Sequence, residues 1–385
     1  MTHTEVLVIG GGVIGSSIAY HLARRGHQVL VVERAQIAVE PAASWASAGG
    51  VRRQGRHPAE AALAIEAVTH WPYLEAELDA DVHYRQGGNL LVAESADEAA
   101  QLAAFAAQQR EMGFADVRWL DQAEVRELVP GIGEQVVAAS TSPADGQADP
   151  ALTTRAFAAA AQHLGATYWT ETPCHALVVS GSRGAIRISG ALTSRGDVAA
   201  EAVVLAAGAW SDELAAGIGL RLPMQMHALQ MVRSTPAPTG VLRPVISPMG
   251  RALSLKQLNN GSFLLGGGWP GDIAADRHGY TLRPASIAGN WAAACAILPA
   301  VGRQLVERAW CGLEAISADE IPLIGPVAGF EGLTVAVGFS GHGFAIAPAV
   351  GRAVADQLAG QPVPELDGLS PARIVEPADA QPAPR

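Results

Sequence analysis

Hydrophobic positions in the first 34 residues change from a continuous run to a helical period and back to a continuous run. Residues 5–9 form a short β-branched run, which is typical of a strand buried on both faces. Apolar residues then recur with helical spacing over residues 13–25, and Gly26 ends the helix. A second apolar run covers residues 29–32. The pattern therefore predicts a strand–helix–strand unit at the start of the chain.

The same interpretation extends along the rest of the chain. Helical spacing predicts five further helices, at residues 58–78, 96–113, 121–128, 151–164 and 284–298. Apolar runs predict strands at residues 82–92, 175–179, 185–189, 202–205 and 333–337. From Pro223 onward alternating strands predominate, and the Asn259–Asn260–Gly261 turn predicts a hairpin. Helices and strands are thus mixed throughout.

The turn between the first strand and the first helix carries glycines in a G-x-G-x-x-G pattern. Gly10 permits a tight turn, Gly12 lets the backbone approach a pyrophosphate, and Gly15 lets the helix pack on the strand. Glu33 follows the second strand, where its carboxylate accepts hydrogen bonds from ribose hydroxyls. These residues predict a dinucleotide site for a ligand without a 2′-phosphate, and they leave the kind of dinucleotide open.

Three later segments are rich in small residues. In SWASAGGVRRQGRH, small residues let the backbone approach a flat ligand and arginines add positive charge, although a solvated surface loop has the same composition; these residues are Ser44, Gly49, Gly50, Arg52, Arg53 and Arg56. Ala206, Ala207 and Gly208 form a turn between a strand and a helix, which suits a ligand or simple packing. The turn at residues 338–343 precedes a helix whose N–H groups would face the same ligand.

Composition narrows the class of protein. The chain has 385 residues, 49% of them hydrophobic, and a formal charge of −11 without any run of basic residues, so neither nucleic acid nor an anionic membrane is an expected partner. Three widely spaced cysteines favour a reduced compartment and neither a disulfide framework nor a metal site. No signal peptide or membrane span is expected. We therefore expect a cytoplasmic protein of two domains.

Together these segments, with ADEIPLIG and GFSGHGF, resemble the flavin-dependent amine and amino-acid oxidoreductases that include glycine oxidase, sarcosine oxidase and D-amino-acid dehydrogenase. GGGWPG and RAWCGLEAISADEIPLIG look most like β subunits of heteromeric dehydrogenases that act on opines, hydroxyproline, proline or sarcosine, which implies α or γ partner subunits. The resemblance implies that FAD is lined by Gly10, Gly12, Gly15, Glu33, Arg34, Ser44, Gly49, Gly50, Ala207, Gly208, Gly341, His342, Gly343 and Phe344.

The resemblance also implies an α/β fold in which a Rossmann-type FAD-binding domain carries an inserted antiparallel-sheet α+β substrate domain. The FAD-binding domain is expected at residues 1–80, 145–222 and 308–362. The substrate domain is expected at residues 81–144 and 223–307, and residues 363–385 are expected to form a partly mobile tail.

The implied reaction removes hydride from the carbon bearing the amine, reduces flavin N5 and leaves an imine that water hydrolyses. A guanidinium fork suits the carboxylate of an amino-acid or opine substrate. By resemblance to sarcosine oxidase, Arg53 takes that role, with Arg52 as the alternative if the alignment shifts by one residue. His227 is a further expected substrate contact.

Sarcosine oxidase has a lysine and a histidine beside the flavin, and Leu265 and Trp269 take their approximate places here, so a dehydrogenase is favoured over an oxidase. The alternatives are a self-sufficient glycine or D-amino-acid oxidase that produces hydrogen peroxide, and a non-catalytic FAD-binding subunit. Cys311 lies about one residue from the position at which some relatives attach flavin. A buried thiol is the simpler interpretation, so FAD is expected to be held without a covalent bond.

Overall fold

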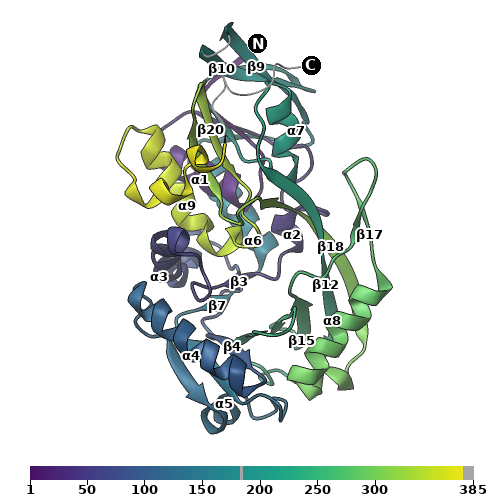
Figure 1. The fold of residues 1–385 in the computed structure, drawn as a ribbon. Coiled ribbons are helices and arrows are strands. Elements are labelled where there is room, and N and C mark those ends of the chain that lie inside the picture. Colours follow the sequence, from purple (N-terminus) through teal and green to yellow (C-terminus); the bar gives the residue numbers. More distant parts are fainter. Residues whose placement is uncertain (183–184, 376–385) are drawn as a thin grey trace.

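Two eight-stranded sheets carry the fold, one in each lobe of the molecule (Figure 1). The computed structural model describes residues 1–182 and 185–375. The first sheet has the order β19-β20-β10-β11-β1-β2-β8, with β9 paired to β10. Its strands are β1 (Thr2–Ile9), β2 (Val29–Val32), β8 (Thr167–Trp169), β9 (Cys174–Ser182), β10 (Ala185–Thr193), β11 (Gly196–Leu205), β19 (Leu323–Val327) and β20 (Phe330–Val337).

The centre of the first sheet is parallel and buried on both faces. β1 pairs in parallel with β2 and β11, and β11 pairs in parallel with β20. Along β1, Val6 and Val8 belong to one hydrophobic cluster whereas Leu7 and Ile9 belong to another, because successive side chains point to opposite faces. This is why the continuous apolar run at the start of the chain correctly predicts a strand with no solvent-facing side.

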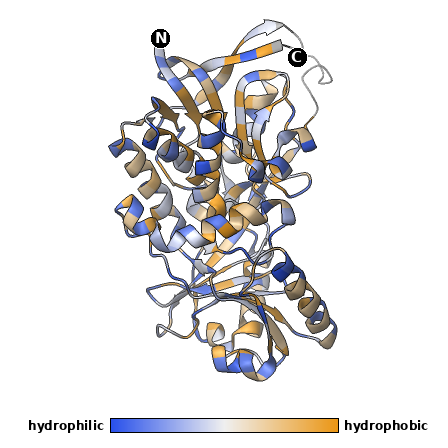
Figure 2. Ribbon diagram, turned by 90° about the vertical axis from the view of Figure 1, so that its left-hand side faces the viewer, coloured by the Kyte–Doolittle hydropathy of each residue, from blue (hydrophilic) through white to orange (hydrophobic). Residues whose placement is uncertain are grey.

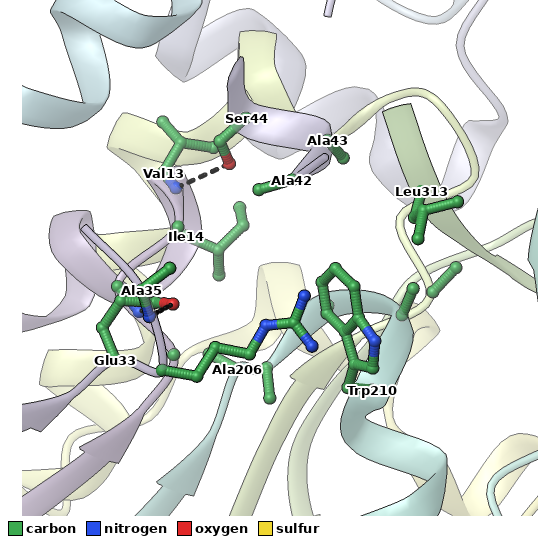
Figure 3. Close-up of a pocket in the computed structure, with 18 of the residues that line it drawn as sticks. Val13, Ile14, Glu33, Ala35, Ala42, Ala43, Ser44, Ala206, Trp210 and Leu313 are labelled. Atoms are coloured by element: carbon green, nitrogen blue, oxygen red, sulfur yellow. Dashed lines mark hydrogen bonds between the residues drawn. The ribbon is translucent and has the colours of Figure 1, made fainter. Parts of the chain in front are cut away.

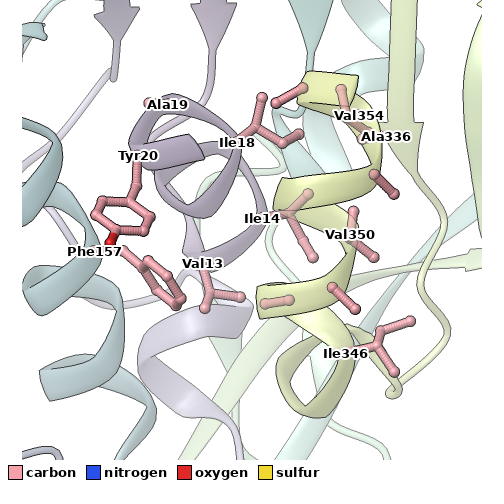
Figure 4. Close-up of a cluster of buried hydrophobic side chains, with 14 of the residues drawn as sticks. Val13, Ile14, Ile18, Ala19, Tyr20, Phe157, Ala336, Ile346, Val350 and Val354 are labelled. Atoms are coloured by element: carbon pink, nitrogen blue, oxygen red, sulfur yellow. The ribbon is translucent and has the colours of Figure 1, made fainter. Parts of the chain in front are cut away.

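Four helices cover one face of the first sheet. They are α1 (Val13–Arg24), α3 (Ala61–Leu78), α6 (Pro150–His163) and α9 (Gly343–Leu358). Figure 4 shows apolar side chains of α1, among them Ile14 and Ile18, packed against Val350 and Val354 of α9. A Cβ on Gly351 would overlap Ser17, so this glycine lets the two helix backbones approach closely. Residues from both ends of the chain therefore share one core.

The second sheet has the order β18-β12-β15-β14-β13-β4-β6-β5. In this sheet β13 pairs with β4 in parallel, whereas all the other neighbouring strands of the sheet pair antiparallel. The second sheet is therefore mixed. Its strands are β4 (Asn89–Ala93), β5 (Arg118–Asp121), β6 (Ala138–Ser142), β12 (Met224–Pro236), β13 (Val245–Pro248), β14 (Ser254–Gln257), β15 (Ser262–Gly266) and β18 (Val306–Ser317).

The second sheet is covered by α4 (Ala96–Glu111), α5 (Gln122–Leu128) and α8 (Pro284–Ile297). The hairpin predicted at Asn259–Asn260–Gly261 is confirmed, because β14 and β15 pair antiparallel on either side of it. The strand predicted at residues 82–92 is wrong at its start, since β4 begins at Asn89. Figure 2 shows hydrophilic residues frequent on the helices that face outward.

Several short elements connect the lobes. β3 (Gly50–Val51) pairs with β7 (Gly146–Gln147) between the two sheets (Figure 1). The remaining short elements are α2 (Ala43–Ala46), α7 (Ser211–Ala216), β16 (Asp272–Ile273), β17 (Tyr280–Thr281), η1 (Pro58–Glu60), η2 (Gly208–Trp210), η3 (Pro299–Arg303), η4 (Pro364–Leu369) and η5 (Pro371–Arg373).

The expected boundaries at residues 308 and 363 both fall at or next to observed elements. The boundary at residue 308 falls inside β18, and the whole of β18 lies in the second sheet. Of the expected tail, residues 364–373 form η4 and η5, and Leu366 and Leu369 are buried in the core of the first lobe. Residues 376–385 lie outside the described part of the chain. Within the part that is described, the search for a helix of sufficient length and apolarity to cross a membrane finds none.

Candidate active site

Glycines shape the turn between β1 and α1. Gly10 has a φ of +107°, which L side chains rarely adopt, and a Cβ at this position would overlap the carbonyl oxygen of Ala206. A Cβ on Gly15 would overlap the carbonyl oxygen of Gly10, and one on Gly12 would lie 3.1 Å from the hydroxyl oxygen of Ser44. Strand and helix are therefore close-packed, and the first N–H groups of α1 have no partner within the helix.

Glu33 lies at the carboxyl end of β2, as the sequence pattern predicts. Its Oε2 accepts a hydrogen bond of 2.7 Å from the N–H of Gly11, and its Oε1 accepts one of 3.0 Å from the N–H of Ala35 (Figure 3). Burial raises the pKa of Glu33, and the two backbone donors oppose that effect. The neighbouring Arg34 stacks its guanidinium over the Trp210 ring at 3.6 Å from the ring centroid. This end of the site suits an adenosine group.

α2 supplies the next part of the wall. The N–H of Val13, at the start of α1, donates a hydrogen bond of 2.9 Å to the Ser44 hydroxyl (Figure 3). Gly49 has a φ of +68° and a Cβ there would overlap the carbonyl oxygen of Ala148, so the chain turns sharply into β3. Gly49 and Gly50 lie beyond the residues that line the main cavity.

The start of α9 reaches the same cavity from the other end of the chain. Gly341, Gly343 and Phe344 line the cavity, as do Ala207 and Gly208 from the turn after β11. The His342 ring instead lies 3.3 Å from the carboxylate of Glu60, and burial lowers its pKa. Two helix N-termini, those of α1 and α9, therefore border one cavity, which favours a ligand with negative charge and carbonyl oxygens.

The cavity fits a dinucleotide. Its volume is about 760 Å³, within the range of roughly 300–1,000 Å³ typical of ligand sites. Its lining combines the glycine turn of β1–α1, the carboxylate of Glu33 and apolar surface from α2 and the turn after β11. The glycine positions whose Cβ would overlap backbone, Gly10 and Gly15, show that the turn is built for close approach. Among the described residues, no group of three or more His, Cys, Asp or Glu side chains could hold a metal ion.

The three arginines that follow β3 have different partners. Arg53 is ion-paired with Asp116 and lies 3.7 Å from a carboxylate oxygen of Asp145. Arg56 donates to the carbonyl oxygen of His342 at 3.1 Å and lies 3.4 Å from Glu60. Arg52 donates only to the carbonyl oxygen of Gln54, at 2.7 Å. No carboxylate lies within ion-pair distance of Arg52 in residues 1–182 and 185–375, whereas the guanidinium of Arg53 is ion-paired, and neither arginine is among the residues that line the cavity.

One face of the second sheet turns toward α2. Met231, Leu264 and Trp310 on this face pack against Ala46 of α2. Leu265, the expected counterpart of the oxygen-activating lysine, points to the opposite face and belongs to the core beneath α8. Lys256 pairs directly with Leu264 across the β14–β15 hairpin and therefore projects from the face that turns toward α2.

Two other expected contacts are not among the residues that line the cavity. The Trp269 indole packs against Gly289 of α8 and donates a hydrogen bond of 2.6 Å to the carbonyl oxygen of Ala252. His227 is exposed on β12, directly opposite Glu314 of β18.

Glu314 is a site residue that sequence reasoning missed. Its side chain lines the cavity, and its Oε1 accepts a hydrogen bond of 2.7 Å from the N–H of Gly341. Desolvation raises the pKa of Glu314 to about 7. The only available signal was an acidic residue within the apolar second half of the strand, and its meaning depends on the glycine turn that folds back beside β18.

Cys311 does not line the cavity. Its thiol is fully buried beside Gly271 and Ala228, and a Cβ on Gly271 would overlap the sulfur. Burial and the nearby charges of Asp272 and Glu40 raise the pKa of Cys311 to about 12, so a reactive thiolate is disfavoured. This location agrees with FAD that is held without a covalent bond.

Comparison with known proteins identifies the group to which this architecture belongs. Residues 5–357 match the family model described as DAO, FAD dependent oxidoreductase. The chain is 31% identical to glycine oxidase of Pseudomonas putida, over 92% of this chain and 94% of that protein, and 29% identical to glycine oxidase of Bacillus licheniformis, over 93% and 94%. The crystal structure of L-proline dehydrogenase from P. horikoshii superposes with a TM-score of 0.88 at 28% identity and covers 97% of this chain and 98% of that one.

These matches cover the glycine turn, both lobes and the start of α9, so they include every part of the cavity. The expected fold, a Rossmann-type FAD-binding domain joined to a substrate domain, is confirmed. FAD is the cofactor of this family, and the residues around the cavity fit it. The chain belongs to the DAO family of FAD-dependent oxidoreductases, and it is a flavoprotein enzyme that acts on the carbon–nitrogen bonds of CH–NH or CH–NH2 donors.

Proposed function

We propose that the protein is an FAD-dependent dehydrogenase of a secondary or D-amino acid, of the opine, hydroxyproline, proline or sarcosine class, and works as the catalytic subunit of a complex with α or γ partners. Bound FAD supplies the acceptor for hydride from the carbon that bears the amine, and the resulting imine is hydrolysed by water. The residues of the chain hold the substrate, exclude water and control the proton on its amine.

The observation that carries the proposal is the apolar wall on the second sheet. Met231, Leu264 and Trp310 pack with Ala46 of α2 into an apolar surface, and we infer that this surface shields the flavin ring and an aliphatic substrate from water. Beside this wall lies Lys256, which is 3% exposed and has a pKa lowered by burial to about 7. Such a lysine is only partly protonated at neutral pH, so it offers a weaker positive charge for oxygen activation than an ordinary lysine would.

Arg52 is the proposed partner for the substrate carboxylate. Its guanidinium has no carboxylate within ion-pair distance among the described residues, whereas Arg53 is ion-paired with Asp116 and lies 3.7 Å from Asp145. Removing Arg53 would leave Asp145, which is fully buried, without its cation. We therefore assign the substrate-binding role to Arg52 and an architectural role to Arg53.

The test is anaerobic reduction of the holoenzyme by a panel of D-amino acids, D- and L-proline, hydroxyproline, sarcosine and opines, followed by flavin absorbance. At least one member of these classes should bleach the flavin, and turnover should be faster with a dye acceptor than with air. If every member leaves the flavin oxidised while an unrelated donor bleaches it, the proposed substrate class is wrong.

A self-sufficient oxidase is the second candidate, and the position of Lys256 favours it. A protonated amine on the face that turns toward α2 would stabilise negative charge formed during reaction with oxygen. Peroxide release in air at the rate of dye-linked turnover, together with a large decrease in that release in Lys256→Met, would make the oxidase the better assignment.

A further inference from the structure

Glu314 is a cavity carboxyl group without a cationic partner. Its Oε1 accepts the N–H of Gly341, but its Oε2 has no hydrogen-bond partner in the described part of the chain. No arginine, lysine or histidine lies within ion-pair distance of it among residues 1–182 and 185–375. Carboxylates placed in partly desolvated sites are normally paired, because an isolated charge there is costly. A ligand with a hydrogen-bond donor or a positive charge would therefore suit the free oxygen of Glu314.

Glu314 lies at the end of the cavity where we expect the flavin ring. Glu33 marks the end that suits adenosine, and the β1–α1 turn suits the pyrophosphate. Glu314 instead lies beside the start of α9, on the same face of β18 as Trp310, whose neighbours are Leu264 and Ala46. Glu314 therefore lies on the sheet face that also carries the apolar surface assigned above to the substrate.

The other titratable side chains on the elements around Glu314 are exposed or bonded to other residues. β12 contributes His227, which is exposed, and the start of α9 contributes His342, whose ring turns to Glu60. β17 contributes Tyr280, whose hydroxyl is hydrogen-bonded to Glu40. α2 and η2, which also pack against β18, carry no titratable side chain.

We propose that Glu314 binds the amino group of the substrate and accepts one proton from its ammonium form. The N–H bond of the ammonium breaks, an O–H bond forms on Glu314, and the amine keeps the electron pair, so the substrate becomes the neutral amine from which hydride can leave. The step moves one proton and requires no other reactant. It rests on the proposed function and names the residue that selects an amine as its donor.

The polarity of the surroundings agrees with a zwitterionic substrate. Burial is the main cause of the lowered pKa of His342, and the positive charges of Arg56 and Arg52 add to it. The carboxyl group of Glu314 meets the neighbouring Gly341 from the side of β18. A cation and a carboxylate therefore flank the same turn. An α-amino acid with its carboxylate toward Arg52 and its nitrogen toward Glu314 matches this arrangement.

The experiment compares two ligands that the enzyme cannot oxidise. 2-Aminoisobutyrate carries an amine and a carboxylate but no hydrogen on its α carbon, and isobutyrate lacks the amine. Binding of each to the holoenzyme at pH 8 is measured by the perturbation of the flavin absorbance. Wild type should prefer 2-aminoisobutyrate, and Glu314→Gln should lose at least about tenfold of that affinity, as expected for a charged hydrogen bond, with less than a twofold change for isobutyrate.

Controls keep the result interpretable. Glu307→Gln, on the exposed part of the same strand, should bind both ligands as wild type does. Glu314→Asp keeps a carboxylate and should keep the preference for the amine. For wild type alone, the affinity for 2-aminoisobutyrate should rise with pH through about 7, because the carboxylate form binds the ammonium. If wild type does not prefer the amine, or if Glu314→Gln retains the preference, the role of Glu314 is wrong.

The two proposals fail differently. If the amino-acid panel bleaches the flavin but Glu314→Gln keeps its preference for 2-aminoisobutyrate, the role of Glu314 is overturned and the proposed function stands. If no member of the panel reduces the flavin, the proposed function falls, irrespective of the binding comparison.

Discussion

Lys256 and Leu264 lie directly opposite each other in the β14–β15 hairpin, so the only lysine of the chain projects from the sheet face that turns toward α2. Lys256 is 3% exposed and makes no hydrogen bond or ion pair with another residue in the described part of the chain. Burial lowers its pKa to about 7, which Asp149 partly opposes and Arg85 reinforces. The lysine is therefore a source of pH-dependent stability.

Lys256→Met should stabilise the protein at pH 7. Between pH 7 and 10.5 the unfolded chain binds a proton at Lys256 that the folded chain has lost, so the wild-type free energy of unfolding rises with pH through this window. The variant should lack this rise and gain a few kcal/mol at pH 7. Thermal unfolding of holoenzyme followed by circular dichroism at pH 7 and pH 9.5 measures both quantities; parallel pH profiles for the two proteins would contradict the prediction.

Glu314 should give stability the opposite pH dependence. Its folded pKa of about 7 lies above its ordinary value of 4.5, so the folded chain keeps a proton that the unfolded chain loses, and stability falls as pH rises between these values. Glu314→Gln should remove this decrease. Denaturant midpoints of FAD-free protein at pH 5 and pH 8 provide the measurement. If the midpoint changes by the same amount between the two pH values in the variant and in the wild type, the pKa of Glu314 is not raised.

Arg53→Ala should destabilise the fold, because it leaves Asp116 and the buried Asp145 without their cation. A loss of about 3 kcal/mol in the free energy of unfolding is expected from breaking a buried pair. Arg52→Met should instead raise the KM for the amino-acid substrate with a smaller loss of stability. Denaturant unfolding and steady-state kinetics of both variants separate these effects; a selective KM defect in Arg53→Ala would reverse the assignment.

Glu33→Ala should weaken FAD binding. The carboxylate organises the glycine turn through the N–H of Gly11 and is placed to accept the ribose hydroxyls. Loss of a charged hydrogen bond predicts at least about a tenfold higher Kd for FAD. Titration of FAD-free protein, read by quenching of flavin fluorescence, gives the value. Glu331→Ala, an exposed substitution in the same sheet, serves as the control and should bind FAD normally.

Gly15→Ala should impair folding, because the added Cβ would overlap the carbonyl oxygen of Gly10. We expect a loss of about 2 kcal/mol or more in stability, together with low FAD content. Gly217→Ala is the matched control, since its Cβ would lie 3.4 Å from the nearest atom and its φ suits any residue. Thermal unfolding compares the two, and equal stability would show that α1 can shift without cost.

Sequence periodicity located most elements. In segments such as α1 and β2 the hydrophobic pattern is strong, and a clear change in the pattern marks where each element begins and ends. It could not show that β13 pairs with β4 in parallel, since such pairing joins strands far apart in the chain. It also could not orient single side chains across the second sheet. Leu265 and Leu264 are neighbours in sequence but face opposite sides of the sheet, so a register error of one residue would exchange them.

The candidate site likewise contains residues that the sequence could predict and residues that it could not. Gly10 and Glu33 were predictable because the motif specifies both the backbone conformation and the chemistry. The partners of Arg53 were not, because Asp116 lies 63 positions away in a separate part of the chain. Glu314 gained its significance only from the turn at Gly341, which tertiary structure brings to it.

Gly351 of α9 lies against Ser17 of α1, near opposite ends of the chain. A ribosome releases residues in order, so the first helix waits without its neighbour until α9 has emerged from the exit tunnel. Enclosure of the flavin by this architecture therefore has to wait until α9 has been synthesised. A message truncated before α9 would yield a polypeptide that retains the complete glycine motif yet cannot enclose its cofactor.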